Sequence, residues 1–289
     1  MKIGVMPPMG TPIATAPYIS QVARAVEELG FDSLWVPEHV VLFDQYASRY
    51  PYSGDGRLAV APGRGIIDPF AALTFAAAVT SRIRLGTGIC LVPQRNPVYT
   101  AKMVASLDWL SGGRFDFGVG IGWLREEFDA LQVPWPRRAQ RTMEYLEVMQ
   151  RLWSDDVAEY HGEMYDLPPS RQDPKPLQQP HPPIHFGGES DAALRRVAIA
   201  GQGWYGFNLD PEAAGERIGH LITQLEANNR SRAEIEVSIC PGRAGGAPSR
   251  ALVEAYDAAG ADQVIFILGG RDADDATARL KELASAVIG

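Results

Sequence analysis

A histidine next to a carboxylate is the feature of this sequence best suited to proton chemistry. Glu38 and His39 follow residues 33–36 after one proline, and this short apolar run is typical of a buried strand. Imidazole changes charge near neutral pH, and a carboxylate that accepts a hydrogen bond from one ring nitrogen fixes the tautomer of the ring. We therefore expect His39 and Glu38 to be catalytic. A histidine that is hydrogen-bonded for structural reasons alone is the alternative that the sequence leaves open.

Other catalytic chemistries lack the residues they need. No His-x-His pair, and no cluster of histidines and carboxylates at metal-ligand spacing, follows a strand candidate, so we predict no metal site. None of the four lysines falls at the carboxyl end of a predicted strand, which argues against a Schiff-base mechanism. Cys90 and Cys240 lie in apolar runs without CxxC spacing, which indicates reduced thiols.

Glycines mark further strand ends at which the backbone can approach a ligand closely. A strand candidate at residues 83–92 contains two glycines, which are typical of a bulge. A second group lies at residues 118–122, but it lacks the helix start that a dinucleotide-binding fold requires. Glycine pairs at 187–188 and 269–270 each precede a helix, so free N–H groups at either turn can hold a phosphate.

The elements that must position these residues alternate regularly along the chain. Helical patterns with apolar residues three and four apart separate eight strand candidates, at residues 3–6, 33–36, 83–92, 115–119, 184–187, 204–207, 236–240 and 264–268. Eight strands and eight helices in strict alternation favour a closed (β/α)8 TIM barrel over an open doubly wound sheet. We expect one domain over residues 1–289, with its site at the carboxyl ends of the strands.

Helix ends and insertions complete this plan. An acceptor followed by proline, at 68–69, 96–97 and 210–211, predicts three helix starts. Four glycines are expected to end helices in the left-handed conformation: Gly30, Gly112, Gly201 and Gly260. Residues 40–67 are an insertion expected to cover the site as a lid, and residues 154–183 are a second insertion with a possible hairpin about His161-Gly162.

The composition and charge of the chain exclude several classes of binding partner. The chain has 46% hydrophobic residues and a net charge of −8, with its charges scattered, so neither nucleic acid nor an anionic membrane surface is an expected partner. The first ten residues contain prolines where a signal peptide needs an apolar stretch, and no apolar run reaches 18 residues. We expect a cytoplasmic protein that acts on a small-molecule substrate.

Several motifs, in this order and spacing, resemble the luciferase-like monooxygenase superfamily. They are Glu38-His39, LGTGICLVPQRNP from Leu85, GGRFDFGVGIGW from Gly112 with Glu126-Glu127 after it, RxxEYLEVMQRLW from Arg141, and FGGES from Phe186. Within the superfamily the chain looks most similar to the branch that uses coenzyme F420, a deazaflavin. The FMN-dependent branch is the alternative, and a non-catalytic barrel that binds the cofactor is a second one.

The resemblance implies a cofactor ring held against a bulge in the third strand, with a cis peptide between Gly88 and Ile89. His39 would give or orient a proton beside the ring, and the turn at residues 187–190 would hold the cofactor phosphate. The cofactor-binding residues that it implies are Glu38, His39, Thr87, Gly88, Ile89, Gly120, Gly122, Trp123, Glu126, Gly187, Gly188 and Ser190.

The resemblance and the sequence also suggest properties of the surface and the pocket. Family members pair through helices next to the bulged strand, so we expect a homodimer that uses the apolar run at residues 71–79. Phe43, Tyr46, Tyr50 and Tyr52 in the first insertion predict an apolar or aromatic substrate pocket.

Overall fold

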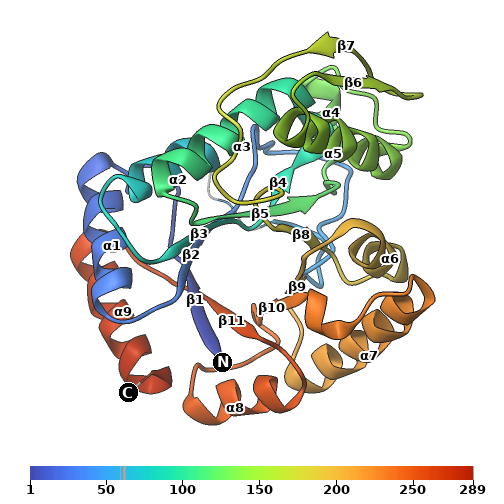
Figure 1. Cartoon of the computed structure of the whole chain (residues 1–289). Coiled ribbons are helices and arrows are strands. Elements are labelled where there is room, and N and C mark those ends of the chain that lie inside the picture. Colours follow the sequence, from blue (N-terminus) through green and yellow to red (C-terminus); the bar gives the residue numbers. More distant parts are fainter. Residues whose placement is uncertain (59, 61–62, 289) are drawn as a thin grey trace.

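The eight predicted apolar runs form a closed ring of parallel strands in the computed structural model, and helices surround this ring (Figure 1). Neighbouring strands follow the order β3-β2-β1-β11-β10-β9-β8-β5-β4, and a pairing between β3 and β5 closes the ring. The structure describes residues 1–58, 60 and 63–288; residues 59, 61 and 62 of the predicted lid and residue 289 of the predicted domain lie outside these. The predicted TIM barrel is confirmed.

The barrel strands are β1 (Lys2–Met6), β2 (Ser33–Val36), β3 (Arg84–Thr87), β4 (Cys90–Leu91), β5 (Phe115–Gly120), β8 (Ile184–Gly187), β9 (Gly203–Phe207), β10 (Glu236–Cys240) and β11 (Gln263–Ile267). The helices are α1 (Ala16–Glu28), α2 (Pro69–Ala77), α3 (Pro97–Ser111), α4 (Arg125–Ala130), α5 (Arg138–Ser154), α6 (Asp191–Ala200), α7 (Pro211–Ala227), α8 (Arg250–Ala258) and α9 (Ala273–Val287). Short 3-10 helices cover Val92–Gln94 and Arg232–Glu234. The described residues therefore contain nine α-helices where the pattern predicted eight, because α4 and α5 both follow β5.

The third barrel strand is interrupted where the glycines predicted a bulge. β3 ends at Thr87, the peptide between Gly88 and Ile89 is cis as predicted, and β4 begins at Cys90. The expectation of one continuous strand over residues 83–92 is therefore wrong. The Thr87 hydroxyl donates to the Gly118 carbonyl at 2.7 Å, so a side chain replaces part of the interrupted backbone pairing.

Most of the predicted helix boundaries are confirmed. Asp68, Asn96 and Asp210 each accept a backbone hydrogen bond as the N-cap of α2, α3 and α7. Left-handed conformations end helices at three of the four predicted glycines, Gly30, Gly112 and Gly260. Gly201 is the exception, because its φ is −85°. A side chain is excluded there for another reason: a Cβ atom would lie 3.0 Å from the Val197 carbonyl oxygen.

The two insertions differ in structure. The described residues of the first one, 40–67, form no helix or strand beyond an isolated bridge between Gly10 and Ile66. The second one contains the predicted hairpin, formed by β6 (Ala158–His161) and β7 (Asp166–Ser170), which extends outward beyond the ring of helices (Figure 1).

Side chains fill the lower part of the barrel. Ser33, Ser238 and Gln263 form a buried polar layer, in which Gln263 Nε2 donates to Ser238 Oγ at 2.8 Å. Above it lies a small apolar cluster of Met6, Trp35, Tyr205, Cys240 and Ile265. A ligand can therefore enter only the upper part of the barrel, at the carboxyl ends of the strands.

The tight packing inside the barrel leads to a stability prediction. A Cβ atom at Gly86 on β3 would overlap the indole ring of Trp35, which is fully buried. We expect Gly86→Ala to lower the free energy of unfolding by about 1–3 kcal/mol, measured by urea denaturation. Gly219→Ala, on an exposed face of α7 with open space around it, should raise that free energy by about 0.5–1 kcal/mol. Equal stability of Gly86→Ala and the wild type would contradict the packing described.

Candidate functional site

A cavity of about 420 Å³ opens at the carboxyl ends of the strands, in the size range of small-molecule sites. Gly88, Ile89 and Met6 line it from the bulge and β1, and residues from the loops after β2, β5 and β8 form its sides. Tyr50 and Tyr52 of the first insertion also line it. The cavity therefore lies where the fold predicts the site, with the insertion against it.

Nine of the twelve predicted cofactor-binding residues line this cavity: Glu38, His39, Gly88, Ile89, Gly120, Gly122, Trp123, Gly187 and Gly188. The other three do not, because their side chains serve the surrounding structure. Thr87 is fully buried and bonded to Gly118, Glu126 accepts the backbone N–H of Ala47 at 2.6 Å, and Ser190 caps α6.

Glu38 and His39 are adjacent in sequence but contact different parts of the molecule. The Glu38 Oε2 atom accepts the Leu91 N–H at 2.5 Å, and Oε1 accepts the Arg95 Nε–H at 2.7 Å. Arg95 also pairs with Asp68, the N-cap of α2. Glu38 thus binds the end of β2 to β4, and its carboxylate is bonded to these groups rather than to His39.

The carboxylate that bonds to His39 is Glu127, which sequence analysis did not assign this role. Its Oε2 atom lies 3.3 Å from His39 Nδ1 and 3.1 Å from Gln94 Nε2, and its Oε1 atom accepts the Val40 N–H at 2.6 Å. Burial raises the pKa of this fully buried carboxyl, but hydrogen bonds from His39, Gln94 and Val40 outweigh the burial and lower the pKa below its ordinary value.

An ionised Glu127 fixes how His39 can act. The carboxylate accepts a hydrogen bond from a protonated Nδ1. The other ring nitrogen, Nε2, is therefore the atom that can exchange a proton with a ligand. Within the described part of the chain, Nε2 has no hydrogen-bond partner, and the imidazole lies at the cavity wall with its edge toward Trp123, at 5.8 Å between ring centroids. The predicted proton-handling position is present, with its supporting carboxylate on α4.

Aromatic rings close the side of the cavity that the insertion forms. The ring centroids of Tyr50 and Trp123 are 5.1 Å apart, and those of Tyr52 and Phe207 are 4.7 Å apart. The Tyr52 hydroxyl donates to Glu189 at 2.8 Å, which fixes the ring in place. Among the described residues, no lysine, arginine or aspartate lines the cavity, and the carboxylate of Glu38, which does line it, is already bonded to Leu91 and Arg95. The wall therefore favours an uncharged substrate.

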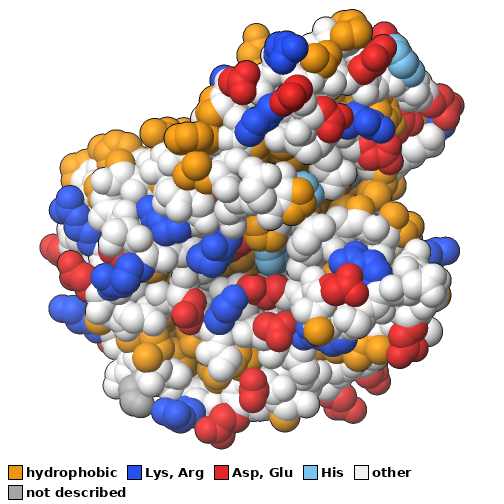
Figure 2. Space-filling model, viewed as in Figure 1, with side chains coloured by type: hydrophobic (Ala, Val, Ile, Leu, Met, Phe, Trp, Pro, Cys, Tyr) orange, Lys and Arg blue, Asp and Glu red, His pale blue; other side chains and the backbone are white. Residues whose placement is uncertain are grey.

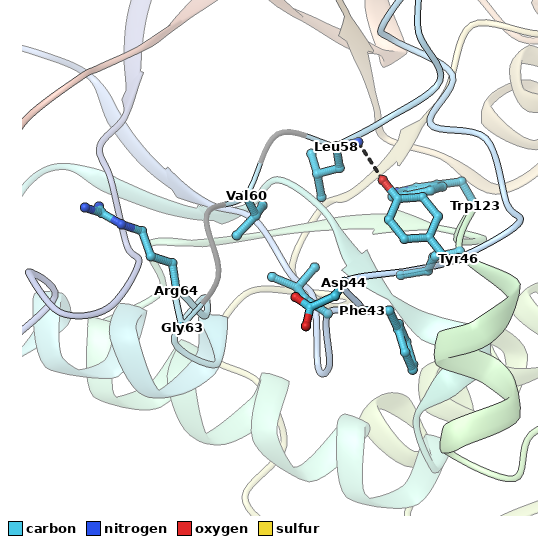
Figure 3. Close-up of a pocket in the computed structure, with 10 residues that line it drawn as sticks. Phe43, Asp44, Tyr46, Leu58, Val60, Gly63, Arg64 and Trp123 are labelled. Carbon is cyan, nitrogen blue, oxygen red and sulfur yellow. Dashed lines mark hydrogen bonds between the residues drawn. The ribbon is translucent and has the colours of Figure 1, made fainter.

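A second, smaller cavity of about 90 Å³ lies beside the first (Figure 3). Phe43 and Tyr46 line it, so only Tyr50 and Tyr52 of the four predicted aromatic residues line the main cavity. Figure 3 shows the Tyr46 hydroxyl accepting the Leu58 N–H, at 2.8 Å. This bond holds one part of the insertion to another beside Trp123.

Two arginines, one of them bonded to the cavity lining at Gly122, form no ion pair among the described residues, and the sequence analysis missed them. Arg138 donates to the Gly122 carbonyl at 3.2 Å and lies over the Trp135 ring. Arg196 lies in α6, the helix after the Gly187-Gly188 turn, and its Nε atom is buried without a hydrogen-bond partner. Burial lowers the pKa of Arg196, and the charge of Arg138 lowers it further. Two neighbouring cations without a carboxylate can take the anionic group of a cofactor.

Of the two glycine turns predicted to hold a phosphate, the one at residues 187–188 faces the cavity. Gly187 and Gly188 line the cavity, whereas the competing turn at 269–270 does not. At that second turn Asp275 accepts the Arg271 N–H at 2.9 Å, so a carboxylate already occupies it. The first turn, with Arg196 on its helix, is the better anion site.

The described residues contain neither a metal-binding cluster nor a membrane-spanning helix. They contain no group of three or more histidines, cysteines and carboxylates arranged to hold a metal ion. In the same part of the chain, no helix has the length and apolar character needed to span a membrane.

Comparison with known proteins places this fold and site in a family. The sequence profile of the luciferase-like monooxygenases matches residues 1–256. An uncharacterised protein of Mycobacterium tuberculosis is 33% identical over 276 residues, which cover 91% of each chain. The FMNH2-dependent dimethylsulfone monooxygenase of Pseudomonas putida is 35% identical over 158 residues, 53% of this chain and 43% of that protein.

A solved structure supports the same assignment at the level of the fold. The coenzyme F420-dependent tetrahydromethanopterin reductase of Methanopyrus kandleri has a TM-score of 0.78 at 18% identity, covering 99% of this chain and 98% of that one. Since the sequence profile covers most of the chain, the protein belongs to the luciferase-like monooxygenase family.

Proposed function

We propose that the protein is an oxidoreductase that transfers hydride between coenzyme F420 and a small, uncharged organic substrate. The observation that carries the proposal is the His39–Glu127 pair at the wall of a cavity whose floor is the Gly88-Ile89 bulge. The overall likeness to an F420-dependent reductase agrees with this choice of cofactor.

The residues of the cavity fit a flat tricyclic ring. A Cβ atom at Gly88 would lie 2.9 Å from Met6 Cε and 3.1 Å from the Tyr205 hydroxyl, so a residue without a side chain is needed there, and bare backbone faces the cavity. Aromatic and apolar groups surround this floor, as a ring requires. Arg138, which is bonded to Gly122 of the lining, and Arg196, whose pKa is lowered by burial and by the charge of Arg138, suit an anionic tail. When bound, the deazaflavin accepts or donates the hydride.

The chain's own residues would supply binding, orientation and one proton. His39 Nε2 gives or takes the proton at the substrate, while Glu127 holds the tautomer and the direction of the ring. Tyr50 and Tyr52 exclude water and favour an apolar or aromatic substrate. Glu38 would act by holding the bulge rather than by touching the reacting atoms.

One observation favours a second candidate function, an FMN-dependent monooxygenase that receives reduced flavin from a separate reductase. The Pseudomonas putida relative is FMNH2-dependent, and its identity to this chain is 35% over the matched residues. A barrel that only binds the cofactor is the third candidate; in it Glu127 would hold the first insertion through Val40, but its bond to His39 would serve no reaction.

Titration with both cofactors tests the proposed choice. We expect oxidised coenzyme F420 to bind the purified protein with a micromolar dissociation constant, measured by the change in cofactor fluorescence, and FMN to bind at least tenfold more weakly. Tighter binding of FMN would favour the monooxygenase. Failure of both rings to bind would contradict the proposed function.

Replacement of His39 tests the proposed proton transfer. His39→Ala should lower turnover by about 10²–10⁴-fold, measured on a substrate found by screening carbonyl compounds, imines and activated alkenes. Its dissociation constant for the cofactor should change little. His220→Ala is a matched control, because this histidine is exposed on α7. Wild-type turnover in the His39 variant would rule out a catalytic role.

We also propose that the protein forms a homodimer through α2 and α3. Phe75, Tyr99 and Leu110 leave 41%, 75% and 65% of their surface exposed on these helices, and Figure 2 shows hydrophobic side chains gathered at this edge, at the upper left. Leu110→Arg would place a charge in this face, so the variant should sediment as a monomer where the wild type sediments as a dimer. A monomeric wild type would overturn the proposal.

A further inference from the structure

Tyr205 has a buried hydroxyl that the functions proposed so far do not use. It lies on β9 inside the barrel, 3% of its surface is exposed, and it lines the cavity. Its hydroxyl oxygen is buried and has no hydrogen-bond partner among the described residues. A buried hydroxyl without a partner is destabilising, so its presence calls for an explanation.

The elements packed around Tyr205 offer no good acceptor. Met6 and Ile265 are apolar, and Trp35, whose ring lies 5.2 Å away, carries only an N–H, which it donates to Ser33 at 2.8 Å. Three polar side chains, Cys240, Tyr52 and Glu189, help to raise the pKa of Tyr205, and of these Tyr52 and Glu189 are bonded to each other. The third is the Cys240 thiol. Burial raises the pKa of that thiol to about 12, so it stays neutral, and a neutral thiol is a weak acceptor.

Three other tyrosines have hydrogen-bond partners for their hydroxyls. The hydroxyl of Tyr52 donates to Glu189, that of Tyr46 accepts the Leu58 N–H, and that of Tyr256 donates to the Leu209 carbonyl at 2.6 Å. Tyr18, on α1, is a second buried tyrosine without a partner, but it does not line the cavity.

The hydroxyl of Tyr205 lies against the bulge. It would be 3.1 Å from a Cβ atom at Gly88, the residue on which the ring is proposed to rest. A ligand that fills the cavity down to this floor would bring its innermost edge to the hydroxyl. Since the hydroxyl lacks an acceptor, the matching ligand atom is an acceptor.

We propose that the Tyr205 hydroxyl donates a hydrogen bond to a carbonyl oxygen on the pyrimidinedione edge of the bound ring. This inference rests on the proposed cofactor site, and it holds for either ring because both carry that edge. Tyr205 is then a positioning residue: it fixes which edge of the ring enters the barrel, and so which edge faces His39.

Tyr205→Phe tests the inference, with Tyr18→Phe as the matched control, because each removes one buried, unpartnered hydroxyl. Each purified variant is titrated with oxidised coenzyme F420 and with FMN, and its melting temperature is measured without cofactor. We expect Tyr205→Phe to bind the preferred ring about 5–20-fold more weakly and to shift the absorbance maximum of the bound ring. Tyr18→Phe should bind like the wild type, and neither variant should melt at a lower temperature.

Two results would overturn the inference, and a third separates it from the proposed function. Unchanged cofactor affinity in Tyr205→Phe would show that no bond to the ring exists. A lower melting temperature of the cofactor-free variant, with unchanged affinity, would show that the hydroxyl bonds to Cys240 in a structural role. If the wild type binds neither ring, the proposed function fails and this inference with it.

Discussion

The interaction on which the site depends is the bond between the Glu38 carboxylate and the backbone of Leu91. The third barrel strand is broken at Gly88-Ile89, and Glu38 holds β4 to the end of β2 beyond the break. Arg95 extends the connection to the start of α2 through Asp68. Glu38 and His39 both line the cavity, but the Glu38 carboxylate is held in this network, so the His39 ring is the one of the two that is left to face a ligand.

Carboxylates that follow β5 and β8 attach the first insertion to the barrel. Glu126 and Glu127 accept backbone N–H groups of the first insertion, and Glu189 accepts the hydroxyl of Tyr52. The insertion is therefore attached to the barrel by the same loops that line the cavity. A site held in this way by charge-assisted hydrogen bonds is preorganised before any ligand enters.

Local sequence patterns predicted the backbone better than the side-chain partners. Apolar runs and acceptor-proline pairs report on their own segment, so the eight strand positions and the starts of α2, α3 and α7 could be read directly, and the two glycines of the third strand predicted its bulge but not its full interruption. Glu127 could not be identified as the partner of His39, because 88 residues separate them and nothing in the spacing of either residue signals the contact. Arg196 was missed for a related reason: only the fold reveals that its buried Nε atom has no hydrogen-bond partner among the described residues. Glycine suits position 201 because a side chain there would crowd the Val197 carbonyl of α6, not because the backbone is left-handed. The sequence alone does not show this contact.

A crystal structure of the protein soaked with oxidised coenzyme F420 tests the central claim most directly. The ring should lie against Gly88 and Ile89, with His39 Nε2 toward its hydride-carrying edge and the Nδ1 atom still bonded to Glu127. A ring bound outside the barrel mouth, or a His39 side chain turned away from an occupied cavity, would contradict the account.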